Sequence, residues 1–112
     1  MLARPRNVET YTDPSGGCPF DDYMDKLKDV IGEAAIEARV TRLESGSLGE
    51  YGDIGDGLIE LKIRVGPAYR IYIADDGANS LILCAGSKRT QRQDIKNAKK
   101  YWADYKVRRG QG

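Results

Sequence analysis

The sequence contains no histidine, and this absence limits the acid–base chemistry available to the chain. Its 112 residues include 18 lysines and arginines and 17 aspartates and glutamates, but no imidazole. Histidine is the one side chain whose unperturbed pKa places its charge change near neutral pH. Proton transfer in this protein would therefore need a carboxylate, a lysine or a tyrosine whose pKa is shifted by its surroundings.

The chain also has few cysteines and no long apolar run. Cys18 and Cys84 are its two cysteines, and they form no C-x-x-C spacing that would indicate a zinc or redox site. Cys84 lies within L-I-L-C-A, which favours a buried reduced thiol, although a disulfide between the two cysteines stays an alternative. No window approaches the length of a membrane-spanning helix, and the N-terminal M-L-A-R-P-R lacks an apolar signal segment. We therefore expect a cytoplasmic protein.

The composition is that of one globular domain with an uneven distribution of charge. Hydrophobic residues make up 40% and charged residues 31% of the chain, and 112 residues suffice for one core but not for two. Residues 1–85 carry nine basic and fifteen acidic side chains, a balance of −6. Residues 86–112 carry nine basic and two acidic side chains, a balance of +7. Such polarity predicts an anionic partner, either nucleic acid or an acidic protein.

The most informative stretch runs from residue 58 to residue 72, L-I-E-L-K-I-R-V-G-P-A-Y-R-I-Y. Apolar and charged residues alternate along its first half, which is typical of a strand whose two faces differ. The turn Gly66-Pro67-Ala68 separates this strand from a second one. On the charged face, the alternation brings together three cations: Lys62, Arg64 and Arg70.

Two interpretations of this charged face remain open. Three adjacent cations repel one another, which favours an anionic ligand. Alternatively, they form the ordinary solvated face of an antiparallel sheet, with Glu60 paired to Lys62 or Arg70 in a weak surface salt bridge. On either interpretation we expect the side chain of Arg70 to face solvent, while Tyr69 and Ile71 anchor its strand on the apolar side.

The remaining pattern predicts an α+β fold: a small, mostly antiparallel sheet with an N-terminal helical hairpin and a C-terminal helix. In the first helix, Phe20, Met24, Leu27 and Ile31 recur at helical spacing and predict its buried face. The expected elements are a strand over 8–12, two helices between 19 and 46 with a break at Gly32, an irregular strand or bulged loop over 46–57, the hairpin, an internal strand over 80–85, a helix over 91–106 capped by Thr90, and a loose basic tail over 107–112.

Neither a phosphate-binding loop nor a metal site is predicted. The glycine-rich segment 46–57 is followed by a strand, whereas a phosphate loop needs Lys-Ser or Lys-Thr and a helix. The aspartate pairs Asp53/Asp56 and Asp75/Asp76 lie among turn residues, where aspartate accepts hydrogen bonds from the local backbone. We expect no metal and no cofactor.

Linked motifs give the chain a family resemblance that covers about residues 20 to 102. The segment E-L-K-I-R-V-G-P-A-Y-R-I-Y resembles the E-L-R-I-x-x-G-P-G-Y-R-V-Y signature of the phage-derived addiction-module killer proteins, HigB-like members of the RelE/ParE toxin superfamily. The downstream G-S-K-R-T-Q-R-Q-D-I-K-N-A-K-K-Y-W is similar to the G-G-D-K-S-x-Q-x-x-D-I-x-x-A segment of that group. The upstream L-G-E-Y-G-D-I-G-D-G-L is similar to its G-D-x-K-x-x-G-x-G-V.

The resemblance implies a single RelE-like domain over residues 1–112 and a toxin of a type II toxin–antitoxin module. It also implies metal-free cleavage of ribosome-associated mRNA and a helix-turn-helix antitoxin as partner. The implied catalytic residues are Lys62, Arg64, Arg70, Lys88 and Arg89. Glu60, Tyr72, Gln91 and Arg92 are further candidates for contacting the substrate. We expect the hairpin and the Lys88–Arg89 turn to share one surface.

The chain departs from the family pattern at three positions. Gly52 stands where relatives often carry a basic residue, and Ala68 replaces the usual glycine before Tyr-Arg. Ile95 lies where some relatives have a tyrosine or histidine. The phosphate-binding cations are therefore matched better than the groups for acid–base chemistry.

Metal-free RNA cleavage needs a base, an acid and cations to stabilise the transition state. Arg70 and Arg89 suit the last role, because a guanidinium binds phosphate oxygens through two parallel hydrogen bonds. Neighbouring cations lower a pKa, and Lys62 is a better proton carrier than Arg64 because arginine scarcely deprotonates. Glu60 and Tyr72 are the alternatives. Two other functions stay open: a ParE-like toxin that inhibits DNA gyrase without cleaving RNA, and an inactive relative that only binds nucleic acid or an antitoxin-like partner.

Overall fold

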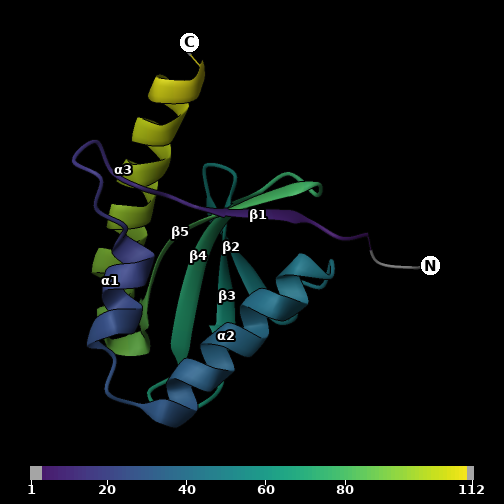
Figure 1. The fold of residues 1–112 in the computed structure, drawn as a ribbon, viewed down its shortest axis with the longest axis vertical. Helices are drawn as coiled ribbons and strands as arrows, with labels where there is room; N and C mark the ends of the chain where they lie inside the picture. The colour runs from purple at the N-terminus through teal and green to yellow at the C-terminus, as the bar shows by residue number, and fades with distance from the viewer. Residues whose placement is uncertain (1–3, 111–112) are drawn as a thin grey trace.

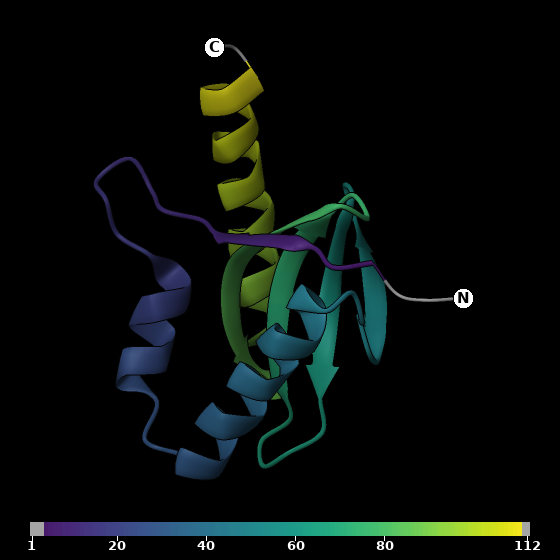
Figure 2. The ribbon, with the colours of Figure 1, turned by 45° about the vertical axis from the view of Figure 1, so that its right-hand side comes forward.

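Five strands form one sheet with helices on both of its faces (Figures 1 and 2). The computed structural model describes residues 4–110. In chain order the elements are β1 (Asn7–Thr10), α1 (Pro19–Lys26), α2 (Val30–Glu44), β2 (Tyr51–Gly55), β3 (Leu58–Ile63), β4 (Tyr69–Asp75), β5 (Asn79–Ser87), the 3-10 helix η1 (Lys88–Thr90) and α3 (Gln91–Gly110). The strand order is β1-β5-β4-β3-β2, and β1 is parallel to β5 while all other pairs are antiparallel. The predicted α+β class with a mostly antiparallel sheet is confirmed.

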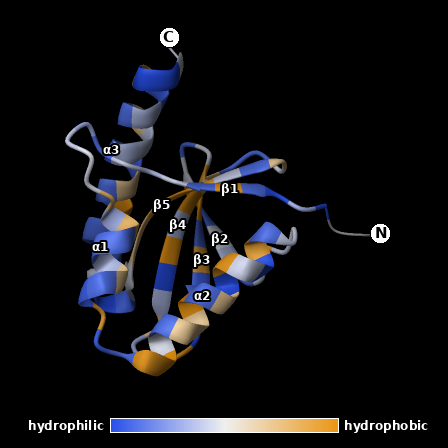
Figure 3. Ribbon diagram, in the orientation of Figure 1, coloured by the Kyte–Doolittle hydropathy of each residue, from blue (hydrophilic) through white to orange (hydrophobic). Residues whose placement is uncertain are grey.

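The central hairpin β3–β4 has the predicted alternation. Lys62 lies opposite Arg70 and Glu60 lies opposite Tyr72, on the face that α3 covers. Tyr69 and Ile71 face the other way and are 3% and 0% exposed within the core beneath α1 and α2. The sheet therefore has two apolar layers, and Figure 3 shows hydrophobic segments along β4 and β5, whereas β1 is hydrophilic.

β5 is the internal strand that the sequence predicted. It pairs with β1 on one side and with β4 on the other, and its residues from Ser80 to Gly86 are all buried. The register shifts between Tyr72 and Ile73, where the longer β5 strand contributes an extra residue. A bulge of this kind bends a strand and re-aims its side chains. The glycine-rich segment likewise forms the short strand β2 with a bulge between Asp53 and Gly55, as predicted.

The N-terminal helices break earlier than predicted. α1 ends at Lys26 and α2 begins at Val30, so the expected break at Gly32 is wrong. The carboxylate of Asp29 caps α2 by accepting from the Gly32 N–H at 3.0 Å, and it also accepts from the Tyr69 hydroxyl at 2.6 Å. An N-cap of this kind ends the preceding segment and restarts the helix at a new angle. As a consequence Ile31 is 72% exposed rather than buried.

The C-terminal helix is longer than predicted. The expected loose tail is wrong for Val107–Gly110, which belong to α3, while residues 111–112 lie outside the described residues. Contacts with the N-terminal segment hold this last turn: the Arg108 guanidinium donates to the Thr12 carbonyl at 2.5 Å and to the Asp104 carboxylate at 2.9 Å. A helix end that bonds another segment does not fray as a free one does.

A buried arginine joins α2 to the β2–β3 hairpin. Arg39 is 6% exposed and donates to the backbone carbonyls of Leu48, Glu50 and Lys62. Burial lowers the pKa of Arg39, yet these carbonyls satisfy its guanidinium. Arg39 therefore fixes the strand that carries Lys62.

The two cysteines, which both lie within the described residues, form no disulfide with each other. Cys18 and Cys84 are both free, as predicted, and burial raises the pKa of Cys84 to about 12. Within the described residues, no helix is both long enough and apolar enough to span a membrane.

Ala68→Gly should stabilise the protein. Ala68 has a φ of 65°, a left-handed conformation that strains every residue with a Cβ atom, in the turn between β3 and β4. Removing the Cβ should raise the free energy of unfolding by about 1 kcal/mol, measured by urea denaturation. The matched control is Ala78→Gly in the β4–β5 turn, because Ala78 is exposed and is not among the residues with positive φ. A gain equal in both variants, or none in Ala68→Gly, would contradict the assignment of strain to residue 68.

Candidate functional site

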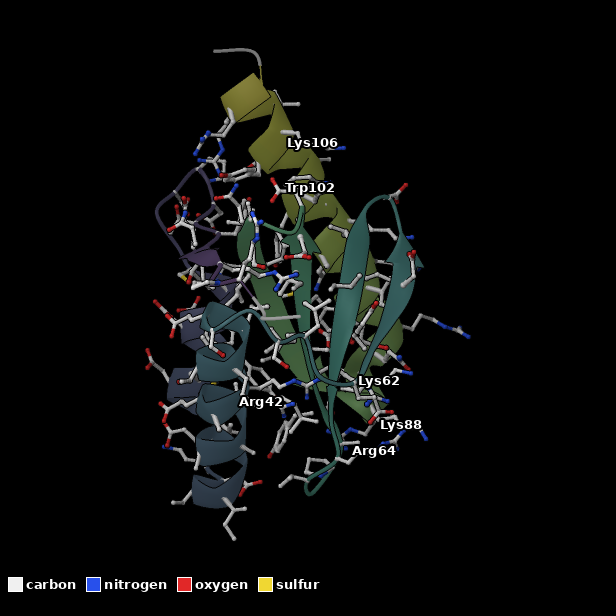
Figure 4. All side chains as sticks on the ribbon, turned by 90° about the vertical axis from the view of Figure 1, so that its right-hand side faces the viewer. Arg42, Lys62, Arg64, Lys88, Trp102 and Lys106 are labelled. Carbon is white, nitrogen blue, oxygen red and sulfur yellow. The ribbon has the colours of Figure 1, made fainter. Side chains whose placement is uncertain are left out.

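The predicted cations meet at one end of the sheet, where the β3–β4 turn touches η1. The Lys88 N–H donates to the Pro67 carbonyl at 3.4 Å, and Figure 4 shows Lys62, Arg64 and Lys88 side by side there. We call Lys62, Arg64, Lys88 and Arg89 the cationic surface. The expectation that the hairpin and the Lys88–Arg89 turn share one surface is confirmed.

A hydrogen-bonded corner positions η1 and its two cations. The Ser87 N–H donates to the Thr90 hydroxyl oxygen at 3.2 Å, and the Thr90 hydroxyl donates to the Asp94 carboxylate at 2.5 Å. Gly86 packs against this carboxylate so closely that a Cβ atom there would lie 1.8 Å from it. Burial raises the pKa of Asp94. Thr90 is predicted to cap α3, but its side chain instead closes a capping box at the start of η1, one turn earlier. Its bond to Asp94 orients Lys88 and Arg89.

Arg70 lies beneath the cationic surface and not on it. Its side chain is 9% exposed, with Nε 3.6 Å from Oε2 of Glu60, whose side chain is 4% exposed. The prediction that Arg70 faces solvent is wrong, because α3 covers this face of β4 and Glu60 draws the guanidinium inward. Within the described residues, Arg70 Nε has no hydrogen-bond partner. Part of its donor capacity is therefore unused in this conformation.

Gln91 reaches the same pair, as a candidate site residue should. Its side-chain amide donates to Oε2 of Glu60 at 2.6 Å, so one carboxylate oxygen faces both Gln91 and Arg70. Arg92 follows on α3 and is exposed. Glu60 itself is buried beside Arg70. A ligand would therefore contact Glu60 only if it entered deeply enough to contact Arg70 as well.

Tyr72 is a core residue. The prediction that it contacts the substrate is wrong for this conformation. Tyr72 is 0% exposed and packs beneath α3. Burial raises the pKa of Tyr72, and the negative charge of Glu60 raises it further. Its phenol is therefore neutral at physiological pH and is unsuited to act as a base.

Arg64 is exposed but already has a partner. Its guanidinium donates to both carboxylate oxygens of Glu50, at 2.7 and 2.5 Å. These hydrogen bonds raise the pKa of Arg64, so the expectation of a lowered pKa is wrong. Sequence reasoning missed Glu50, because only the β2–β3 register brings it beside Arg64. The cations of this surface without a carboxylate partner among the described residues are Lys62, Lys88 and Arg89.

Two of the four paired aspartates accept hydrogen bonds from the local backbone, as predicted, whereas Oδ2 of Asp56 lies 3.6 Å from Nζ of Lys99. Asp53 accepts from the Gly55 N–H at 2.7 Å, and Asp76 accepts from the N–H groups of Ala78 and Asn79. Asp75 differs, since it forms a salt bridge with Arg6 at 2.7 Å. Within residues 4–110, no three cysteine or carboxylate side chains gather as a metal site would require.

The chain is similar to a protein of Haemophilus influenzae (strain ATCC 51907 / DSM 11121 / KW20 / Rd) that is described as uncharacterized. The two are 42% identical over 81 residues, which cover 71% of this chain and 82% of the other protein. No family model matches the chain. No solved structure matches it either.

Arg70→Ala should destabilise the fold, in contrast to the substitution of an exposed cation. Removing Arg70 leaves Glu60 buried without its counter-ion, which costs about 3 kcal/mol. The double variant Glu60→Gln, Arg70→Gln buries no charge and should recover part of this loss. Urea denaturation gives the free energy of unfolding of Arg70→Ala and of the double variant relative to the parent protein. Arg64→Ala serves as control because the side chain of Arg64 is 72% exposed. Equal stability of Arg70→Ala and Arg64→Ala would show that the Glu60–Arg70 pair has no structural role.

Proposed function

This chain belongs to the same family as the uncharacterized Haemophilus influenzae protein, and we propose that it is the toxin of a type II toxin–antitoxin module. In this proposal the protein is a metal-free endoribonuclease that cleaves ribosome-associated mRNA in the cytoplasm. The family resemblance of residues 20–102 suggests the class, and the site supports it.

The observation that carries the proposal is a buried Glu60–Arg70 pair directly below the cationic surface. Lys62 lies opposite Arg70 on the neighbouring strand, and Gly86 lies opposite Arg70 on β5, only two residues before Lys88. A phosphate bound between Lys62 and Lys88 would therefore lie over the Arg70 guanidinium. Cations that converge from three segments repel one another, and a polyanion removes that cost.

Phosphate binding would change the partner of Arg70. At 3.6 Å, its Nε is close enough to Glu60 for an ion pair but too far for a good hydrogen bond. Two phosphate oxygens offer the guanidinium a better bidentate fit. In the proposed reaction the phosphate displaces Glu60, and the Glu60 carboxylate then accepts the proton of the RNA 2′-hydroxyl.

The rest of the reaction follows from the same groups. The 2′-oxygen attacks the adjacent phosphorus, and the bond from phosphorus to the 5′-oxygen breaks. Arg70 and Arg89 stabilise the charge of the phosphorane, and the Lys62 ammonium donates a proton to the departing 5′-oxygen. The products are a 2′,3′-cyclic phosphate and a 5′-hydroxyl. Because no histidine takes part, we expect catalysis to depend mainly on positioning and electrostatic stabilisation.

The proposed partner of the toxin is a small helix-turn-helix antitoxin encoded beside it. Lys62, Lys88 and Arg89, which have no carboxylate partner among the described residues, favour an antitoxin whose acidic segment covers the cationic surface and excludes RNA.

Arg70→Lys should lower the rate of RNA cleavage at least tenfold. Lysine keeps the charge that pairs with Glu60 but loses the bidentate fork, and a loss of about 1.4 kcal/mol in the transition state corresponds to tenfold. The assay follows an end-labelled mRNA on programmed ribosomes and free in solution. Arg42→Gln is the matched control, because Arg42 is an exposed cation on α2, away from the cationic surface (Figure 4).

A substrate with a single 2′-deoxy nucleotide at the cleavage position tests the chemistry itself. It should stay intact at that position, because the nucleophile has been removed. No cleavage of ribosome-bound or free mRNA by the folded protein would refute the nuclease. Retained RNA binding would then favour the inactive relative, and loss of supercoiling activity of purified DNA gyrase would favour the ParE-like alternative.

A further inference from the structure

A cleft of about 290 Å³ lies at the end of the sheet opposite the cationic surface. One wall is the second half of α3, and the other is formed by β1, the end of β4 and the β4–β5 turn. Figure 4 shows Trp102 on α3 far from Lys62 and Lys88. The proposed nuclease chemistry makes no use of this cleft. The lining residues that matter here are Glu9, Asp75, Asp76, Trp102, Tyr105 and Arg109.

The α3 wall is aromatic and already holds cations. The rings of Trp102 and Tyr105 stack with centroids 5.7 Å apart. Lys106 Nζ lies 5.3 Å from the centroid of Trp102, and Arg109 Cζ lies 5.4 Å from that of Tyr105. The Arg109 guanidinium also donates to the Tyr105 hydroxyl at 3.1 Å. Ring faces attract cations of this type, and each of these two rings already lies beside a cation from the next turn of α3.

The sheet wall is acidic and only partly neutralised. Asp75 is bound by Arg6, which leaves Asp76 and Glu9 without an ion-pair partner among residues 4–110. Asp76 is exposed, and the N–H groups of Asn79 and Ala78 lower the pKa of its carboxyl, which keeps it ionised. Within the part of the chain that the structure describes, the Glu9 carboxylate accepts a hydrogen bond only from the Asn7 side-chain amide, at 3.2 Å.

We propose that this cleft binds an organic cation through a guanidinium group, held between the carboxylates of Asp76 and Glu9 and the rings of Trp102 and Tyr105. Asp76 and Glu9, which have no ion-pair partner among residues 4–110, face Arg109 across the cleft, and Lys106 lies beside it over the ring of Trp102. The volume of the cleft, about 290 Å³, lies just below that of ligand pockets, which span about 300–1,000 Å³, and suits one side chain or one small amine. A guanidinium satisfies both walls, because it bonds carboxylates in its plane and stacks on rings through its faces.

Arg109 is an internal competitor in this arrangement. It is exposed, and it lies over the ring that an incoming guanidinium would use. A ligand must therefore displace Arg109 or bind against its repulsion. Removing the charge of Arg109 should therefore strengthen binding. If the cleft were only a solvated surface with no ligand, this substitution would have no effect on binding.

Trp102 makes the proposal directly testable, because it is the single tryptophan of the chain. Its fluorescence in the full-length protein is followed while N-acetyl-arginine amide is added, with N-acetyl-citrulline amide as the uncharged isostere. Capped arginine should give a saturable change, and citrulline should not. Agmatine distinguishes the source: tighter binding of agmatine indicates a free small amine, and tighter binding of capped arginine indicates a side chain of a protein.

Three variants complete the experiment. Asp76→Asn keeps an oxygen that accepts the turn N–H groups, and it should weaken binding about tenfold, equivalent to 1.4 kcal/mol. Asp53→Asn is the matched control, since Asp53 is an exposed aspartate of β2 that also accepts a local backbone N–H but lies outside the cleft, and it should leave binding unchanged. Arg109→Gln should tighten binding severalfold. Absence of a saturable change in the parent protein, equal responses to arginine and citrulline, or unaltered binding in Asp76→Asn would each overturn the proposal. None of these measurements involves RNA, so their outcome is independent of the proposed nuclease.

Discussion

The Glu60–Arg70 ion pair is the constraint on which the rest of the structure depends. Both side chains are almost completely buried, and a charge removed from water without a partner costs several kcal/mol. The pair therefore ties β3 to β4, and Gln91 ties the same carboxylate to the start of α3. Any rearrangement of the hairpin must keep these groups together or supply another ion in place of one of them. An anionic ligand is such an ion, which links the stability of this region to its proposed function.

α3 connects the two regions that are proposed to bind ligands. Its start carries the hydrogen-bonded corner of Gly86, Thr90 and Asp94, which holds the cationic surface, and its second half forms the aromatic wall of the cleft. At about 1.5 Å per residue, the 20 residues of this helix span about 30 Å, which separates the region at its start from the region at its second half. Salt screens interactions over such a distance, so the two proposed ligands would bind with little electrostatic coupling.

Much of the fold was predictable because it depends on local patterns. Period-two alternation predicted the hairpin, an apolar run predicted β5 as an internal strand, and a glycine cluster predicted the bulged β2. The failures lie where a distant contact prevails over a local signal. Asp29 bonds Tyr69 and moves the helix break away from Gly32, and Arg108 bonds Thr12 and extends α3 through the expected tail. Neither partner is close in sequence, so no window of residues contains the information.

The sequence by itself determined which side of the hairpin each residue of β3 and β4 occupies, because strand geometry sends successive side chains to opposite faces. The same alternation places Lys62 and Arg70 on one face, while the expectation that Lys88 lies near them came from the family resemblance. Only the tertiary structure decided how exposed these residues are. The packing of α3 buries Arg70 against Glu60, and the β2–β3 register brings Glu50 to Arg64. Charge pairing and burial depend on distances between segments far apart in the chain, and a pattern of residue types does not contain those distances.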